Sequence, residues 1–340
     1  MKLVIQIPCL NECDQLATML SDLPRSIEGI DEIEVLIIDD GSTDGTSDRA
    51  AELGVHHIVR FPRNRGLSAA FLAGIDTALR LGADVIVNTD ADNQYKGQDI
   101  ARLVAPIVQG EADIVVGDRQ TDTIQHFSLL KRLLQRWGSG IVRRASGTSV
   151  RDATSGFRAH SRRAALGLFV HNRFSYTVET IVQAGRSGLT LNSVAIGTNP
   201  KTRESRLFKG MAQYLRRNGP VILRAYGMYQ PVQTLAYVAL SFMAAGLGLV
   251  GRFFYFYLQD PAHSGHTQSL TLGVGCVVLA CLTGVVAMVS DLLAANRRLL
   301  EELLSRMRRL DAVLAREAVR RKEPLDGVRS TGAAPWRPAG

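Results

Sequence analysis

Two long segments without charge most constrain how this 340-residue chain can fold. Val232–Gly251 is uncharged over 20 residues and Ser269–Ser290 over 22. About 20 helical residues cross a hydrocarbon core of about 30 Å, and a spanning segment must satisfy its own backbone hydrogen bonds. A buried helical hairpin of a soluble protein is the alternative. The sequence therefore predicts a two-helix membrane hairpin over residues 231–293, with spans at about 232–257 and 269–291.

The charges beside the two spans predict their orientation. Lys201–Arg224 holds seven basic residues against one acidic residue, and Arg297–Lys322 holds nine against four, whereas the turn Phe253–Gln268 holds no Lys or Arg. Loops rich in Lys and Arg stay on the cytoplasmic side. Met1-Lys2 leads into a strand pattern without a secretory signal, and the four cysteines fit a reducing compartment. We therefore expect a multi-pass protein of the cell inner (plasma) membrane, with its large N-terminal domain and both termini cytoplasmic.

The basic character of the chain belongs to these two flanks. They contribute +6 and +5 to a formal net charge of +8, so the rest of the chain sums to 8 − 11 = −3. Clusters of Lys and Arg next to a membrane span attract anionic lipid heads. We therefore expect the bilayer as a partner and no nucleic acid.

Up to about residue 200, short apolar runs alternate with helical patterns. The predicted strands are Leu3–Ile7, Glu34–Ile38, His57–Phe61, Asp84–Thr89 and Asp113–Val116. The predicted helices are Asp14–Leu23, Thr46–Leu53, Leu67–Leu81, Ile100–Val108 and one near Thr177–Ser187. The region Thr121–Val150 is polar and irregular. This alternation predicts an α/β domain over residues 1–204, with a mostly parallel sheet covered by helices on both faces.

Two amphipathic patterns flank the hairpin. Ser205–Leu223 interleaves apolar and basic residues, which predicts an interfacial helix within residues 205–230. After the second span, residues spaced by three and four form an a/d seam on a predicted helix over 294–322: Leu293, Asn296, Leu300, Leu303, Met307, Leu310 and Leu314. Two interpretations stay open: a homo-oligomer through a cytoplasmic coiled coil, or a single amphipathic helix lying on the membrane or on its own domain. Residues 323–340, rich in Pro and Gly, are predicted to be disordered.

Three polar motifs follow predicted strands of the same sheet. They are Ile7–Glu12, Asp39–Thr46 and Asp90–Tyr95. Ligands of open α/β sheets bind at the carboxyl ends of the strands. The paired carboxylates of Asp90-Ala91-Asp92 suit a divalent cation that is also held by substrate phosphates, although a solvated turn explains the same residues. For Asp39 and Asp40 the alternative to binding is a helix-capping role.

The motifs, taken in order, resemble a known family. They are Pro8…Asn11-Glu12, Asp39-Asp40-Gly41-Ser42-Thr43-Asp44-Gly45-Thr46, Asn64-Arg65-Gly66, Asp90-Ala91-Asp92 and Asp152…Ser155-Gly156-Phe157-Arg158. Over roughly residues 1–210 this set resembles the inverting nucleotide-sugar glycosyltransferases, and most closely the dolichyl/polyprenyl-phosphate sugar transferases. The hairpin is similar to that of bacterial members with a two-helix membrane anchor. The resemblance implies the GT-A fold, a Rossmann-like α/β architecture, followed by an all-α membrane hairpin and a C-terminal helix.

The resemblance also implies site residues. Those implied for the nucleotide sugar, either UDP- or GDP-linked, are Pro8, Leu10, Glu12, Asp39, Asp40, Asp90, Ala91 and Arg119. Those implied for a Mg²⁺ or Mn²⁺ ion are Asp90, Asp92 and Gln94. The catalytic residues implied are Asp92, Asp152 and Arg158. Leu10 stands where the family often has an aromatic residue, which leaves the nucleotide open. Arg203 and Arg206 fit contact with the acceptor phosphate and, equally, general attraction to lipid heads.

The predicted reaction is transfer of the sugar to a polyprenyl (undecaprenyl/dolichyl-type) phosphate on the cytoplasmic face, by metal-assisted inverting displacement. The metal and nearby arginines would stabilise negative charge on the leaving diphosphate. A phosphate acceptor is already anionic, so a strong general base is unnecessary. The first alternative is transfer to a lipid or glycan hydroxyl in envelope polysaccharide synthesis, with Asp152 beside the acceptor oxygen. The second is a non-catalytic membrane scaffold.

Overall fold

The computed structural model describes residues 1–119, 150, 152–170, 176–199, 231–259, 267–321, 325 and 327–331. The chain divides into two compact units. The first comprises Met1–Gly219 with Glu302–Gly340, and the second comprises Pro220–Glu301. The predicted interfacial helix at 205–230, Arg203, Arg206 and the irregular region 121–149 lie outside the described residues.

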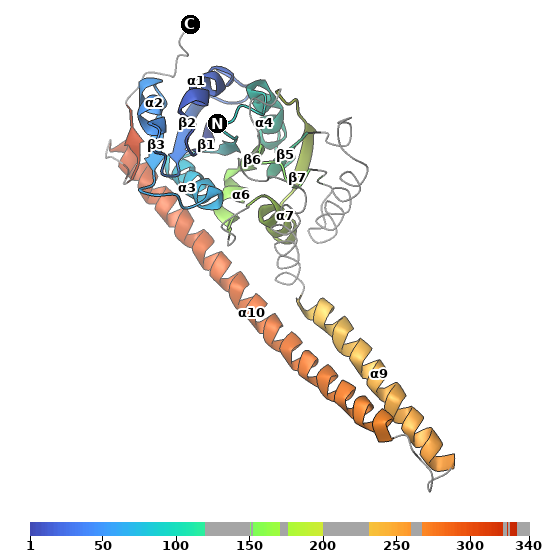
Figure 1. Ribbon diagram of the computed structural model, residues 1–340. Helices are drawn as coiled ribbons and strands as arrows, with labels where there is room; N and C mark the ends of the chain where they lie inside the picture. Colours follow the sequence, from blue (N-terminus) through green and yellow to red (C-terminus); the bar gives the residue numbers. More distant parts are fainter. Residues whose placement is uncertain are drawn as a thin grey trace. The chain divides into compact units, whose positions relative to one another are not determined.

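The first unit is built on one mixed sheet (Figure 1). Within the described residues its strand order is β7-β5-β6-β4-β1-β2-β3-β8. The strands are β1 Lys2–Cys9, β2 Glu32–Asp39, β3 His57–Arg60, β4 Val85–Asn88, β5 Ile114–Asp118, β6 Arg158–Ser161, β7 Leu191–Ala195 and β8 Arg329–Ser330. The helices are α1 Cys13–Ser21, α2 Thr46–Glu52, α3 Leu67–Arg80, the 3₁₀ helix η1 Gly97–Asp99, α4 Ile100–Val108, α6 Arg162–Gly167 and α7 Thr177–Arg186. The pairings from β4 through β1 and β2 to β3 are parallel, which confirms the predicted sheet type.

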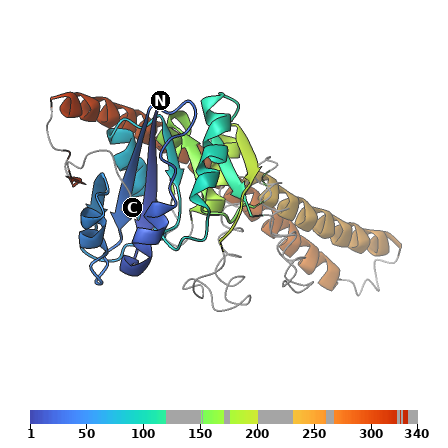
Figure 2. The ribbon, with the colours of Figure 1, turned by 90° about the horizontal axis from the view of Figure 1, so that it is seen from above.

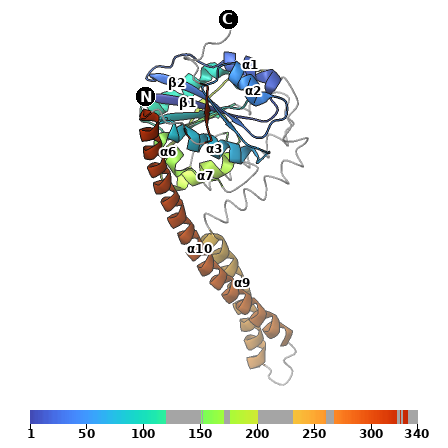
Figure 3. The ribbon, with the colours of Figure 1, turned by 90° about the vertical axis from the view of Figure 1, so that its left-hand side faces the viewer.

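Helices cover both faces of this sheet, as the alternation predicts. α1, α2 and α4 lie on one face, and α3, α6 and α7 lie on the other (Figures 1 and 3). Figure 2, which looks onto the first of these faces, shows α1 and α4 over the strands. Because β1 is sandwiched between the two layers, residues 3–9 are all buried, and alternate side chains pack into opposite layers. The sheet is therefore a rigid platform for the loops at its edge.

The strands and helices predicted before residue 119 are all present, with ends shifted by at most two residues. Four later elements are not predicted by the sequence: β6, α6, β7 and β8. The sequence of β6 is Arg-Ala-His-Ser, which contains no apolar run and therefore does not look like a buried strand. Its two polar side chains, Arg158 and His160, are nevertheless buried. β6 inserts between β4 and β5 and runs antiparallel to both. It thereby places residues 152–157 between the ends of two parallel strands.

Part of the predicted disordered tail is ordered. Arg329 and Ser330 form β8, which pairs antiparallel with β3 at the edge of the sheet. The Thr331 hydroxyl donates a 2.7 Å hydrogen bond to the carbonyl of Val55. The prediction of disorder from residue 323 onward is therefore wrong at these residues. An edge strand offers unpaired backbone groups, which a tail without an apolar pattern can still satisfy.

The second unit consists of one long helix and the first part of another, which pack against each other; the second of these helices continues past Glu301, where the first unit resumes. They are α9 Pro231–Gln259 and α10 Thr267–Arg320, and both are long and apolar enough to cross a bilayer. The predicted second span and the predicted helix after it form one unbroken helix, α10. The helices α9 and α10 run side by side (Figure 1), and their backbones come close at Gly246 and Gly273. A Cβ at Gly246 would lie 2.9 Å from the carbonyl oxygen of Gly273, and a Cβ at Gly273 would lie 3.0 Å from that of Gly246.

We predict that Gly246→Ala destabilises the hairpin while Gly248→Ala does not. An added methyl group at Gly246 meets backbone that cannot move aside, whereas nothing lies within 4 Å of a Cβ at Gly248. Overpacking of this kind costs about 1–3 kcal/mol. Thermal unfolding of the full chain in detergent micelles should show a lower midpoint for Gly246→Ala only. Equal midpoints for the two variants would contradict close packing of the helices.

Candidate active site

The predicted motifs meet at one edge of the sheet. β1 ends at Cys9 opposite Asp39, the last residue of β2, and Gln6 in β1 lies opposite Asn88, the last residue of β4. Because β6 runs antiparallel to both β4 and β5, those two strands are parallel, and the residue after β5, Arg119, lies at the same edge. The strand ends therefore gather the acidic motifs and one arginine, as the sequence predicts.

Asp90 and Asp92 form the turn that follows β4. The backbone N–H of Gln94 donates a 3.1 Å hydrogen bond to Asp92 Oδ1, and Asn93 adopts a left-handed conformation with φ of 53°. Asp90 keeps partial solvent access, and Ala91 between the two acids is buried. Desolvation, with the charge of Asp92 adding to it, raises the pKa of Asp90 to about 7. This carboxyl group therefore lacks enough positive charge nearby to favour its ionised form.

A buried polar cluster forms the floor beneath Asp90. Asn88 Nδ2 donates hydrogen bonds of 2.9 Å to the Gly156 carbonyl and to the Tyr176 hydroxyl, and Asn88 Oδ1 accepts one of 2.9 Å from Gln6. The Tyr176 ring stacks on Phe71 with centroids 3.9 Å apart. These contacts fix the backbone on which the predicted site rests.

Gly156 lies close to Asp90 and Tyr176, so a side chain there would crowd both groups. A Cβ at this position would lie 3.1 Å from Asp90 Oδ2 and 3.1 Å from the Tyr176 hydroxyl oxygen. The sequence motif marks Gly156, but no sequence pattern marks Asn88 or Tyr176 as part of the site. Their contribution depends on the insertion of β6, which the sequence does not predict.

Arg119 and Asp152 form a buried ion pair at the same edge. Arg119 Nε and Nη2 donate hydrogen bonds of 2.7 and 3.0 Å to the two carboxylate oxygens of Asp152, and Nη2 also donates to the Thr154 hydroxyl at 2.8 Å. The Asp152 side chain is 2% exposed and that of Arg119 is 20% exposed. Burial works against ionisation of Asp152, but the hydrogen bond and charge of Arg119 outweigh it and lower the pKa of this carboxyl group. Asp152 therefore orients Arg119.

Arg158 does not face the crevice. Its side chain is fully buried, and its guanidinium donates to the carbonyls of Ser155, Thr177 and Ala153 and to the Thr180 hydroxyl. These bonds tie the loop before β6 to the first turn of α7. Among the described residues the guanidinium makes these internal contacts, which suit a positioning role; the catalytic role implied for Arg158 stays a prediction. A buried charge of this kind is tolerated only when it is hydrogen-bonded.

Asp39 and Asp40 organise the loops beside the site. Asp39 Oδ1 accepts a 2.7 Å hydrogen bond from the Ser42 N–H, and Asp39 also accepts from the Ser47 hydroxyl. Asp40 accepts from the N–H groups of Arg65 and Gly66 at 2.6 and 2.9 Å. These two carboxylates therefore cap turns, and Asp40 connects the second predicted motif to the third.

The loop after β1 is held against the loop after β2. The Asn11 N–H donates to the Ser42 hydroxyl at 2.9 Å, and the Glu12 N–H donates to the Thr46 hydroxyl at 3.0 Å. Pro8 and Glu12 are buried, whereas Leu10 is 36% exposed. Of the residues implied for the nucleotide in this loop, Leu10 presents the most accessible side chain.

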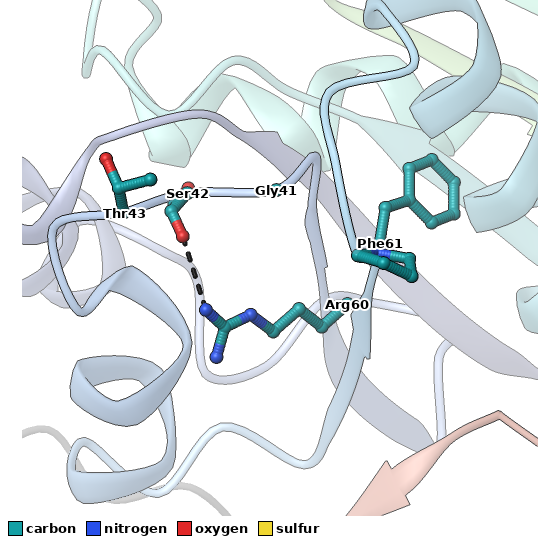
Figure 4. Close-up of a pocket in the computed structure, with 6 residues that line it drawn as sticks. Gly41, Ser42, Thr43, Arg60 and Phe61 are labelled. Atoms are coloured by element: carbon teal, nitrogen blue, oxygen red, sulfur yellow. Dashed lines mark hydrogen bonds between the residues drawn. The ribbon is translucent and has the colours of Figure 1, made fainter.

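A cavity of about 370 Å³ opens beside these loops (Figure 4). Its lining residues are Gly41, Ser42, Thr43, Arg60, Phe61 and Pro62. Arg60 Nη2 donates a 3.3 Å hydrogen bond to the Ser42 carbonyl across the cavity mouth. The sequence motifs mark the glycine and hydroxyl side of this cavity, but not its arginine and aromatic side.

The turn after β4 fits a hard divalent cation. The described residues contain no group of three or more His, Cys, Asp or Glu side chains gathered for a metal. Mg²⁺ and Mn²⁺ sites that also use substrate phosphates need only one or two carboxylates, which Asp90 and Asp92 supply, with the amide oxygen of Gln94 as a neighbouring donor. The raised pKa of Asp90 agrees, since a bound cation supplies the positive charge that this site lacks.

The first unit is similar to known proteins. The family model described as Glycosyl transferase family 2 matches residues 4–169. An uncharacterized protein of Methanocaldococcus jannaschii is 32% identical over 58% of this chain and 81% of that protein. The polyprenol monophosphomannose synthase of Mycolicibacterium smegmatis is 31% identical over 47% and 61%, and the undecaprenyl-phosphate mannosyltransferase of Micrococcus luteus is 29% identical over 58% and 83%.

A solved structure has the same fold. Glucosyl-3-phosphoglycerate synthase from Mycobacterium tuberculosis, crystallised with Mn²⁺, UDP-glucose and phosphoglyceric acid, superimposes with a TM-score of 0.54 at 20% identity. The match covers 66% of this chain and 80% of that one. The GT-A-like architecture expected from the motifs is therefore confirmed.

We predict that Asp152→Asn destabilises the fold by on the order of 3 kcal/mol, because it leaves the Arg119 guanidinium buried without its counter-charge. The pKa of Asp152 is lowered in the folded state, so the pair stabilises the protein above the unfolded pKa of about 3.9 and loses this effect as the pH falls through the folded value. Chemical unfolding of the full chain at pH 7 measures the difference.

The matched control is Glu52→Gln, which removes an exposed ion pair with Arg49. Exposed pairs contribute about 0–1 kcal/mol, so this variant should unfold almost like the parent. Equal stability of Asp152→Asn and Glu52→Gln would contradict the buried pair.

Proposed function

This chain belongs to glycosyl transferase family 2, and on that premise we propose that it transfers a sugar from a UDP- or GDP-linked donor to a polyprenyl phosphate. The acceptor we propose is of the undecaprenyl or dolichyl type, at the cytoplasmic face of the plasma membrane. Relatives named as polyprenol- and undecaprenyl-phosphate sugar transferases support the acceptor class. The two long apolar helices support a site of action at the bilayer, where a polyprenyl chain is dissolved.

The observation that carries this proposal is the bidentate ion pair between Asp152 and Arg119. Transfer to a hydroxyl group needs a base beside the acceptor oxygen, and Asp152 is the acid that the sequence offers for that task. Its two oxygens are occupied by a bidentate contact with Arg119, and its lowered pKa makes it a poor proton acceptor. A phosphate acceptor is anionic at neutral pH and needs no such base. The geometry therefore favours a phosphate over a hydroxyl acceptor.

The acids after β4 would bind the diphosphate end of the donor. Asp90, Asp92 and Gln94 would hold a Mg²⁺ or Mn²⁺ ion, which when bound neutralises charge that builds on the departing diphosphate. Arg119, fixed by Asp152 and one-fifth exposed, adds a second positive group at the same edge. A positively charged group that is already held in place, as Arg119 is, needs no reorganisation when negative charge develops in the transition state.

The nucleoside end of the donor would lie toward the cavity between the ends of β2 and β3. Strands in a sheet lie about 4.8 Å apart, so the end of β2, two strands from β4, is about 10 Å from the acids after β4. The half-exposed guanidinium of Arg60, 3.7 Å from Asp39, offers a positive charge there. This placement agrees with the nucleotide role implied for Leu10, Asp39 and Asp40.

The reaction we propose is a single inverting displacement. A phosphate oxygen of the acceptor forms a bond to the anomeric carbon from the face opposite the diphosphate. The bond between that carbon and the diphosphate oxygen breaks, and its electron pair stays on the nucleoside diphosphate. The products are a polyprenyl-phosphate sugar and the free nucleotide. Arg203 and Arg206, which lie outside the described residues, remain our candidates for contact with the acceptor phosphate.

We predict that Asp92→Ala lowers transfer by at least about 100-fold, the loss typical when charge stabilisation at a transition state is removed. The assay uses the purified full-length protein in polyprenyl-phosphate micelles, with UDP- and GDP-sugars and Mg²⁺ or Mn²⁺. Glu111→Ala, which removes an exposed carboxylate in the turn after α4, is the control and should retain activity. Unchanged activity of Asp92→Ala would refute the metal assignment.

A parallel reaction with polyprenol in place of polyprenyl phosphate separates the two acceptor classes. We expect product only with the phosphate. Product with the alcohol and none with the phosphate would favour the hydroxyl-acceptor alternative.

A further inference from the structure

The C-terminal part of α10 carries an apolar seam that its own unit leaves uncovered. The seam side chains are each more than half exposed: Leu303 57%, Met307 60%, Leu310 65% and Leu314 63%. On the opposite side of the same helix Ala312 is fully buried and Ala315 is 7% exposed. The helix therefore lies on its own domain by one face and presents the a/d seam on another.

Arg308 fixes the rotation of α10 that exposes the seam. Its Nε lies 2.8 Å from Asp76 Oδ1 on α3, and its guanidinium lies over the Phe169 ring, 4.6 Å from the ring centroid. It also donates a hydrogen bond to the Leu168 carbonyl. In a heptad with Met307 at position a, Arg308 is at b and Ala312 at f, so the b and f positions face the domain. The sequence pattern alone leaves open whether this helix packs on its own domain or forms a coiled coil with a second chain. The contacts of Arg308 show that the helix packs on the domain and that the a/d seam remains exposed.

We propose that this seam pairs with the same seam of a second copy of the chain, as a parallel coiled coil. The proposal rests on the membrane placement in the proposed function, because hairpins in one bilayer orient the two helices alike. Helices rise 1.5 Å per residue, so Leu303 and Leu314 lie about 18 and 35 Å along α10 beyond Asp291, the first charge after the uncharged segment. Lipid tails cannot cover side chains at that distance.

Charge complementarity supports a parallel pair. Arg306 occupies position g and Asp311 position e, and in a parallel pair g faces the e position five residues further along the second helix. Arg306 is 71% exposed and already pairs with Glu302 of its own helix at 2.6 Å, so its guanidinium can bridge to Asp311 of the second copy. An antiparallel pair brings like positions together and loses this attraction.

Cysteine cross-linking of the full-length chain in native membranes tests the pairing. The four native cysteines, Cys9, Cys13, Cys276 and Cys281, are first replaced by Ala. In this background we expect Met307→Cys to form a disulfide-linked dimer at least about tenfold faster than Arg309→Cys, because a positions touch across the pair and c positions point outward. Both residues are exposed on the same turn, so access to oxidant is matched. Equal rates for the two variants would overturn the proposal.

Charge reversal tests the parallel register. Arg306→Asp and Asp311→Arg should each slow cross-linking through Met307→Cys, and the double reversal should restore the rate. Failure of the double reversal to restore it would overturn the parallel arrangement.

The glycosyl transfer assay on the same membranes separates this proposal from the proposed function. Transfer without preferential cross-linking refutes the pairing alone. Preferential cross-linking without transfer to polyprenyl phosphate supports the pairing and counts against the proposed function.

Discussion

The buried guanidinium of Arg158 is the interaction on which the site depends. A fully buried charge is costly unless every donor finds an acceptor, and Arg158 finds its acceptors in the loop before β6 and in the first turn of α7. The same bonds hold the loop that carries Asp152 and Gly156. Without them neither the pair with Arg119 nor the close approach of Gly156 to Asp90 would be fixed. The buried charge of Arg158 thus holds in place the loop that borders the site.

The site that results carries an imbalance of charge at the end of β4. Asp90 lies between the buried polar cluster beneath it and the carboxylate of Asp92. The positively charged Arg119 at the same edge is already paired with Asp152. A diphosphate bound here would add more negative charge, which a divalent cation would offset. In the function we propose, such an arrangement would stabilise a departing diphosphate better than it would remove a proton. That bias is why we favour a lipid phosphate as the acceptor.

The strand ends and the acids on them can be predicted from the sequence, because buried parallel strands are continuous apolar runs and polar residues mark where those runs end. The insertion of β6 cannot be predicted in this way, because its buried Arg158 and His160 look like surface residues in the sequence. Because this insertion is not visible in the sequence, no pattern marks the floor residues Asn88 and Tyr176, and the internal contacts of Arg158 cannot be predicted. The a/d spacing on α10 was visible, but only the contacts of Arg308 reveal which face remains exposed.

The central claim is that Asp90 and Asp92 together hold a divalent cation, and calorimetric titration with Mn²⁺ tests it most directly. Since the pKa of metal-free Asp90 is raised to about 7, most of its carboxyl groups are protonated at pH 6 and ionised at pH 8. Binding should therefore release about one proton at pH 6 and few at pH 8, as seen in buffers of different ionisation enthalpy. Asp90→Asn should abolish this release. Mn²⁺ binding with the same proton release at both pH values, or unchanged in Asp90→Asn, would contradict the account.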